Sequence, residues 1–151
     1  MPHENKEAEE KPPVTEKGGL KLVWSDEFDK DGLPDYTKWG YNLGGNGWGN
    51  KAYNHLDGTQ KSDTLRVPDC SSAFHVYALD WSADSIKSFV DDKQYFSFAN
   101  DHSGHDAWPF DDKMYLILNL AIGGSWGGAK GVDDTIFPQR MEVDYVRVYQ
   151  K

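Results

Sequence analysis

A glycine-rich stretch around one tryptophan, residues 44–50 with the sequence GGNGWGN, has the residue types best suited to hold a ligand. Its glycines leave the backbone bare around the large ring of Trp48, and Asn46 supplies amide donors and acceptors at short reach. A flat apolar ring beside forked polar groups suits a carbohydrate, because a sugar ring has an apolar face and a rim of hydroxyls. The stretch therefore predicts a sugar-binding cleft. The alternative is that Trp48 packs into the core.

A second tryptophan between glycines, Trp126 in the stretch GGSWGG at 123–128, has the same character. Glycines at these positions would let a polysaccharide approach the backbone closely. Asn119 lies on the apolar segment that leads into this stretch, where it can line the same face. The residues that we expect to bind a sugar are Asn46, Trp48, Asn119 and Trp126. The tryptophans that we expect in the core or at its rim are Trp24, Trp39, Trp81 and Trp108.

Cutting a sugar chain requires a pair of carboxyl groups, one acid and one nucleophile or base. Glu142 and Asp144, in the sequence MEVDYV, alternate on one predicted strand face, but valines take the next positions on that face. The acidic run at 26–29 is typical of a solvated strand end. His75 lies within a predicted strand, where a packed or hydrogen-bonded role is expected. We assign no catalytic residue.

The elements that must position these residues read as strands. Alternation with a period of two predicts strands at 20–28 and 74–82, and a hairpin over 85–98 that turns at Asp91-Asp92. The segment 114–122 is apolar on both faces, as expected of a central strand, and 140–150 is a further strand. No segment shows a helical period. The fold class predicted is an all-β sandwich.

Composition limits the function classes. The chain has 151 residues, enough for one domain, and its net charge of −9 argues against a nucleic-acid partner and an anionic membrane surface. No stretch approaches the roughly 18 apolar residues of a membrane span. Residues 1–19 are rich in Glu, Lys and Pro and lack the apolar core of a signal peptide, which predicts a disordered tail before a domain at 20–151. Cys70 is the single cysteine, so no internal disulfide forms.

Several blocks, taken together and in order, resemble family 16 of the glycoside hydrolases, and within it the laminarinases, which cut β-1,3-glucans. The blocks that resemble the family's opening are LVWSDEFD (22–29), LPDYTKW (33–39) and GGNGWGN (44–50). Those that resemble its closing half are FHVYALDWSADSIKSFVDD (74–92), WPFD (108–111), LILNLAIGGSWGG (116–128) and FPQRMEVDYVRVYQ (137–150). The resemblance implies a concanavalin-like jelly-roll β-sandwich, a concave face that binds a β-1,3-glucan, and an extracellular or periplasmic location.

The family's catalytic strand has the pattern Glu-x-Asp-x-x-Glu, in which the first Glu is the nucleophile and the last the general acid and base of a retaining hydrolysis. No such pattern occurs in the 151 residues. The family would place it between the counterparts of Asn50 and Lys51, where this sequence passes directly to a stretch that resembles the family's segment after the catalytic strand. The resemblance therefore predicts an internal deletion at 50/51 and a sandwich shortened by several strands. Exposed strand edges are then expected to promote self-association.

A structural Ca²⁺ is also implied by the resemblance. Asp144 matches the family's side-chain ligand, and Glu27 lies where a backbone carbonyl is used. The alternative is a surface Asp144 without a metal.

Three interpretations of the function remain open. The chain is a glucan hydrolase by descent that is inert alone, a non-catalytic β-glucan-binding module, or a fragment without function.

Overall fold

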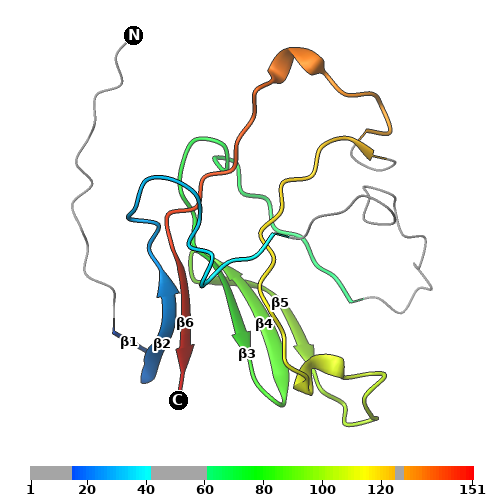
Figure 1. The fold of residues 1–151 in the computed structure, drawn as a ribbon. Helices are drawn as coiled ribbons and strands as arrows, with labels where there is room; N and C mark the ends of the chain where they lie inside the picture. Colours follow the sequence, from blue (N-terminus) through cyan, green and yellow to red (C-terminus); the bar gives the residue numbers. More distant parts are fainter. Residues whose placement is uncertain (1–14, 42–60, 125–127) are drawn as a thin grey trace. The chain divides into compact units, whose positions relative to one another are not determined.

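A computed structural model of the chain describes residues 15–41, 61–124 and 128–151 (Figure 1). The elements placed there are β1 (Glu16–Lys17), β2 (Leu20–Asp26), β3 (Tyr77–Trp81), β4 (Ser85–Val90), β5 (Lys93–Ala99), the 3-10 helices η1 (Pro109–Asp111) and η2 (Asp134–Ile136), and β6 (Val146–Gln150). The strands form two antiparallel sheets, with the orders β1-β2-β6 and β3-β4-β5. The predicted all-β class is confirmed.

The chain divides into two compact units, Met1–Leu43 with Met141–Lys151, and Gly44–Arg140. The first unit holds β1, β2 and β6, and the second holds β3, β4 and β5.

In the first unit, the first long strand pairs with the last (Figure 1). β2 and β6 run antiparallel from Lys21 opposite Gln150 to Asp26 opposite Val146, with a bulge between Leu22 and Trp24. Leu20, Leu22 and Trp24 are half-buried whereas Lys21 and Val23 are exposed, so burial follows the period of two in the sequence. The expected strand 20–28 is confirmed over most of its length.

In the second unit, the predicted hairpin forms at the expected residues. β4 and β5 are joined by Asp91 and Asp92, whose φ angles are 49° and 64°. Positive φ at both central residues defines a type I′ turn, whose twist matches that of the flanking strands, and Asp tolerates this region better than most residues. β3 pairs along the other edge of β4, from Tyr77 opposite Val90 to Trp81 opposite Ile86.

The buried apolar side chains in the described part of the chain are few. Trp108 is 2% exposed and Val90 6% exposed. The ring of Trp108 packs against Phe98 and Phe110, with ring centroids 5.4 Å and 5.1 Å apart, and Phe98 meets Phe110 at 6.4 Å. This trio of rings is the core that the second unit retains, and it confirms the expectation for Trp108.

Three expected strands are wrong in whole or in part, and the one expected at 74–82 is shortened to β3, Tyr77–Trp81. The segment 114–122, expected to be a central strand, forms none and is exposed throughout (Figure 1, yellow). A strand that is apolar on both faces needs neighbours at its edges and cover on both sides, and the described residues supply neither. The strand expected at 140–150 is restricted to β6, because β2 provides ladder partners only from Val146 onward.

The tail predicted for 1–19 is too long at its C-terminal end. Residues 1–14 lie outside the described residues, but Glu16 and Lys17 pair with Lys21 and Leu20. Gly18 and Gly19 both have positive φ, which allows the tight reversal that folds β1 back on β2. In the described residues, no helix has the length and apolar character needed to cross a bilayer.

Candidate functional site

The expected sugar-binding residues fall mostly outside the described residues. Asn46, Trp48 and Trp126 lie there, as do both residues flanking the predicted deletion, Asn50 and Lys51. Asn119 is described, and its side chain is exposed within the extended segment 113–122. These four assignments stay predictions.

The glycines around Trp126 have a backbone reason of their own. Gly124 has a φ of 77°, and the amide of Gly128 donates to its carbonyl oxygen at 3.0 Å. A Cβ on Gly128 would lie 2.7 Å from that oxygen, which is a backbone clash. The backbone therefore favours glycine at 124 and 128 whether or not a ligand binds there.

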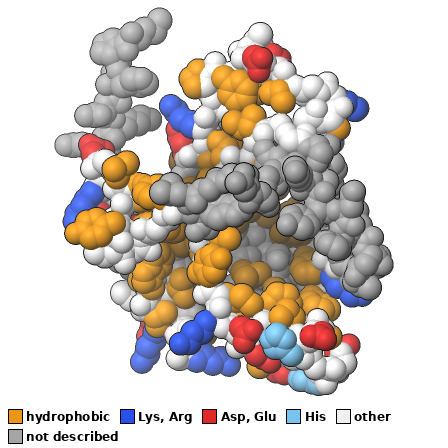
Figure 2. All heavy atoms as spheres, turned by 45° about the vertical axis from the view of Figure 1, so that its right-hand side comes forward, with side chains coloured by type: hydrophobic (Ala, Val, Ile, Leu, Met, Phe, Trp, Pro, Cys, Tyr) orange, Lys and Arg blue, Asp and Glu red, His pale blue; other side chains and the backbone are white. Residues whose placement is uncertain are grey.

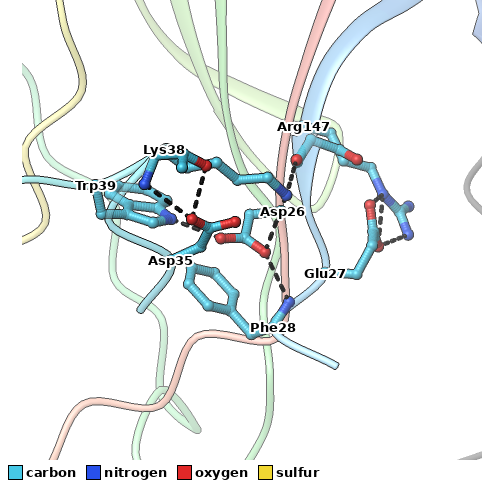
Figure 3. A network of polar contacts seen from close by, with 9 residues as sticks. Asp26, Glu27, Phe28, Asp35, Lys38, Trp39 and Arg147 are labelled. Atoms are coloured by element: carbon cyan, nitrogen blue, oxygen red, sulfur yellow. Dashed lines mark hydrogen bonds and ion pairs between the residues drawn. The ribbon is translucent and has the colours of Figure 1, made fainter. Parts of the chain in front are cut away.

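The acidic run at the end of β2 is solvated only in part: Asp29 is exposed, as the sequence predicts, but Asp26 and Glu27 are not. Asp26 is buried, with its side chain 10% exposed, and Figure 3 shows its carboxylate between Lys38, Trp39 and Phe28. The indole Nε1 of Trp39 donates to Oδ2 at 2.6 Å, and the amide of Phe28 donates to Oδ1 at 3.2 Å. The ammonium of Lys38 lies 3.4 Å from Oδ1 and donates to the carbonyl oxygen of Ser25 at 2.8 Å.

These contacts set the charge of Asp26. Burial alone would raise the pKa of Asp26. The hydrogen bonds from Trp39 and Phe28 and the charge of Lys38 lower the pKa by more than burial raises it, so the pKa lies below its ordinary value. Asp26 is therefore an anion at neutral pH that already accepts from Trp39 and Phe28 and lies beside the ammonium of Lys38. It ties the loop that carries Trp39 to β2, which is a structural role.

Glu27 is engaged by β6. The Nε and Nη2 of Arg147 donate to its two carboxylate oxygens, the shortest contact being 2.6 Å from Nη2 to Oε2 (Figure 3). The hydrogen bond and charge of Arg147 lower the pKa of Glu27. A carboxylate held as an anion in a bidentate pair cannot act as a general acid, so Glu27 is excluded from that role.

Glu142 and Asp144 do not share the strand face that their spacing suggests. Both are exposed and lie in 141–145, which precedes β6 and has no strand conformation. The period-two argument requires an extended ladder, and the ladder with β2 begins only at Val146. The shared strand face that would make Glu142 and Asp144 a pair does not form in the described structure.

The two residues of the Ca²⁺ prediction, Glu27 and Asp144, lie near one end of the β2–β6 ladder. Because Asp26 pairs with Val146, the β2–β6 ladder brings Glu27 and Asp144 to the same end of the sheet. A carbonyl of Glu27 and the carboxylate of Asp144 supply only part of the six to eight oxygens that Ca²⁺ takes. No group of three His, Cys, Asp or Glu side chains suited to a metal occurs among the described residues, and Arg147 places a guanidinium on Glu27. The Ca²⁺ site stays a prediction.

An apolar hollow of about 540 Å³ opens on the β3-β4-β5 sheet. Trp81 lines it at 46% exposure, and its Nε1 donates to the carbonyl oxygen of Phe110 at 3.0 Å. Its lining residues are Lys61, Leu79, Trp81, Ile86, Phe96, Phe98, Ala107, Pro109, Phe110 and Met114. Sequence reasoning misses this hollow because it expects β3 to be covered and Trp81 to lie in the core or at its rim.

The hollow has the size of a ligand site but not the chemistry of a sugar site. A sugar requires several side chains that hydrogen-bond its hydroxyls. Lys61 is the one charged side chain in the lining, and the indole N–H of Trp81 is already bonded. The walls are otherwise aliphatic and aromatic, which is the composition of a sandwich interior.

His75 is hydrogen-bonded, as expected. Its Nδ1 lies 2.6 Å from Oδ2 of Asp91, and its Nε2 lies 3.4 Å from Oδ1 of Asp69. Asp91 also accepts the amide of Val76 at 2.9 Å, so the hairpin turn is tied to the residues before β3. The hydrogen bond to Asp91 raises the pKa of His75 and lowers that of Asp91.

Comparison with known proteins gives a consistent set of relatives. The family described as glycosyl hydrolases family 16 matches residues 21–147. A beta-glucanase of Rhodothermus marinus is 30% identical over 243 residues, with 86% of this chain and 85% of the relative covered. A beta-1,3-glucan-binding protein of Penaeus monodon is 31% identical over 122 residues, with 68% of this chain and 33% of the relative covered.

Among solved structures, the laminarinase from Rhodothermus marinus has a TM-score of 0.61 and 48% identity. The match covers 66% of this chain and 42% of that one, so this chain spans less than half of the solved relative. The alignment with the beta-glucanase accounts for the difference in length between this chain and its relatives. Because 86% of 151 residues is about 130, roughly 110 of its 243 aligned positions have no counterpart here.

Proposed function

The chain belongs to glycosyl hydrolase family 16, with the jelly-roll β-sandwich fold of that family, and we propose that it is an endo-β-glucanase by descent that no longer cuts glucan by itself. The observation that carries the proposal is the absence of Glu-x-Asp-x-x-Glu from a chain that aligns with a beta-glucanase nearly end to end. The unmatched positions of the relative lie between matched ends, which supports an internal deletion.

The chemistry of retention sets the requirement. Two carboxyl groups about 5 to 5.5 Å apart must act as nucleophile and as acid and base. Beyond residue 16 the sequence has two glutamates, Glu27 and Glu142. Glu27 is held as an anion by Arg147, and Glu142 is exposed on a segment without a strand ladder. Neither has the placement that the reaction needs.

The substrate class is inferred from the relatives and from the sequence. The relatives include a beta-glucanase and a beta-1,3-glucan-binding protein. The stretch around Trp48 and the stretch around Trp126 carry rings and amides suited to a glucan. We propose a β-1,3-glucan as the ligand. Since a polysaccharide does not cross a membrane unaided, we also propose an extracellular or periplasmic site of action.

One relative favours a second candidate function. The Penaeus monodon protein has the name of a binding protein, and 68% of this chain aligns with it. A non-catalytic β-glucan-binding module therefore competes with a remnant that has no function of its own. Binding distinguishes these two.

Two assays test the proposal. The 151-residue chain is incubated with laminarin and reducing ends are measured, with the Rhodothermus marinus laminarinase as positive control. We expect no hydrolysis, since acid–base catalysis alone is worth about 10² to 10⁴-fold and the nucleophile is absent as well. Turnover that disappears in Glu142→Gln would overturn the proposal and reveal a relocated site.

Calorimetric titration with a β-1,3-glucan oligomer then separates a binding module from a remnant. A binding module loses affinity in both Trp48→Ala and Trp126→Ala and keeps it in Tyr36→Ala, which removes an exposed ring elsewhere (90% exposed). Equal affinity in all three variants would remove the two tryptophans from the site. No binding by the unaltered chain would favour a remnant that has no function of its own.

A further inference from the structure

One face of the β3-β4-β5 sheet carries a continuous apolar surface. The register places Trp81 opposite Ile86 and Ile86 opposite Phe98, so these side chains share a face across three strands. Leu79 and Phe96 extend the row on either side of Ser88. All five apolar residues line the same hollow, which confirms that they project to one side.

This face is only partly covered in the described structure. The rings of Trp108 and Phe110 pack on Phe98, whereas the β3 side of the face is exposed. Leu79 is 61% exposed, and Tyr77 and Trp81, two residues to either side along β3, are exposed as well. Figure 2 shows hydrophobic side chains gathered at the surface. A sheet with one apolar face is stable in water only when a second layer buries that face. Contiguous exposed apolar area of this kind marks an interface.

The extended segment 113–122 has the same character. Ile117 is 62% exposed, and its neighbours Leu116 and Leu118 are exposed too, so apolar side chains at both odd and even positions of the segment are exposed. The backbone from 113 to 122 has no strand ladder, although its sequence is apolar enough for a central strand. A partner that supplies strands would satisfy both the side chains and the backbone.

The aligned relatives identify what is missing. Roughly 110 positions of the beta-glucanase lie inside the alignment and have no counterpart in this chain. At the usual spacing of about 8 to 12 residues for each strand with its turn, that length holds several strands. It is enough for a second layer over β3-β4-β5 and for neighbours of 113–122.

We propose that the apolar face of β3-β4-β5, with the segment 113–122, is a docking surface for this missing family segment when it is supplied as a separate polypeptide. The partner has strands with one apolar face, and it adds backbone hydrogen bonds at the open edges. A second copy of the chain, the self-association that exposed strand edges predict, is the competing occupant; it fits less well, because each copy carries a net charge of −9 and like charges oppose association. The inference rests on the proposed function in so far as both invoke the same missing segment.

The test uses the full 151-residue chain and, as probe, the segment of the Rhodothermus marinus beta-glucanase that has no counterpart here. The two are co-expressed, so that a segment insoluble by itself is still presented to the chain. We expect a one-to-one complex in sedimentation analysis and strong protection from amide hydrogen exchange over 114–122, which the chain alone lacks. Absence of a complex would overturn the proposal.

Variants locate the surface. Leu79→Asp and Ile117→Asp each place a charge at an exposed position, so the chain keeps its own fold, and we expect each to weaken the complex at least tenfold. Tyr36→Asp in the first unit is the matched control and leaves the affinity unchanged. Equal affinity in all three would place the contact elsewhere and overturn the proposal. A dimer of the chain alone that Leu79→Asp disrupts would make a second copy the occupant and also overturn it.

Laminarin hydrolysis by the complex is measured separately. A complex without hydrolysis supports the docking surface and removes the glucanase from the proposed function. Hydrolysis by the chain alone contradicts the proposed function and leaves the docking result to stand by itself.

Discussion

The two sheets have three antiparallel strands each, yet different forces hold them. In β1-β2-β6, polar contacts tie the strands and the following loop together. Asp26 contacts Lys38, Trp39 and a backbone amide, and Glu27 forms a bidentate ion pair with Arg147. In β3-β4-β5, three packed rings centred on Trp108 stabilise one side. On the rest of that sheet's apolar face, Leu79 and Trp81 are exposed and Ile86 and Phe96 are half-buried.

The difference shows which interactions each sheet completes with its own residues. The β4–β5 hairpin needs only residues that are neighbours in the sequence. The β2–β6 ladder and its charge pair need the first long strand and the last strand, and the chain has both. Burial of an apolar face depends on a second layer, and the residues described in the second unit supply one only around Trp108. Measurements that resolve the two sheets separately can therefore test whether different interactions stabilise them.

The largest effect is expected from Trp108→Ala. It removes the centre of the ring trio, and truncation of a buried aromatic side chain costs about 3 to 5 kcal/mol. Hydrogen exchange should show loss of protection in β4 and β5 with β2 and β6 unchanged. Tyr77→Ala, an exposed ring on β3, is the control, with a cost of about 0.5 kcal/mol or less. Equal costs for the two variants would mean that the ring trio is not the core of this unit.

The second effect is expected from Asp26→Ala in the other sheet. It leaves the indole N–H of Trp39 and the amide of Phe28 without their acceptor, and hydrogen bonds to a charged group are worth about 1.5 to 3 kcal/mol. We expect a loss of about 2 kcal/mol in the stability of β2 and β6, measured by denaturant titration with exchange readout. The exposed Asp29→Ala should cost little. Loss of protection in β4 and β5 as well would show that the sheets unfold as one.

The comparison also separates what the sequence predicts from what it does not. The hairpin at Asp91-Asp92 and the strand at 20–26 are predictable, because turn chemistry and period-two alternation act over a few residues. The pairing of the first strand with the last is predictable only through the family resemblance. These are interactions that the present residues complete by themselves.

The failures share one cause. The segment 114–122 has the sequence of a central strand, but a central strand exists only with neighbours, and these are not part of its own sequence. Solvation of Asp26 is the wrong expectation because its burial depends on Lys38 and Trp39, which lie 12 and 13 residues later and show no periodic relation to it. The predicted sugar-binding residues Asn46, Trp48 and Trp126 lie outside the described residues and stay predictions.

A smaller effect, which depends on pH, is expected from the contact of His75 with Asp91. The folded-state pKa of His75 is raised, so its contribution to stability is complete below the unfolded value of about 6.5 and is lost as pH rises through the raised pKa. The pKa of Asp91 is lowered from 3.8, so its contribution is lost only as pH falls through that lower value. The contact therefore stabilises the second unit most between about pH 4 and 6.5.

Denaturant midpoints measured from pH 5 to pH 9 test this contact. His75→Gln should flatten the decline on the alkaline side, because the charged partner of Asp91 is gone. His105→Gln is the control: His105 pairs with Asp112, but both side chains are about two-thirds exposed, so solvent and salt screen the pair. A decline that persists in His75→Gln and vanishes in His105→Gln would assign the effect to the exposed pair.

The smallest effect is expected at the hairpin turn itself, where two adjacent aspartates have different tasks. Asp92 has a φ of 64°, and glycine at this position gives the Asp-Gly pair that type I′ turns favour. Asp92→Gly should therefore stabilise the second unit by about 0.5 kcal/mol, since a side chain in this region of φ is strained. Asp91→Gly relieves the same kind of strain but removes the acceptor of His75 and of the Val76 amide, so it should destabilise. Midpoints that shift in the same direction for both variants would show that the turn, and not the contact with His75, sets the stability of this hairpin.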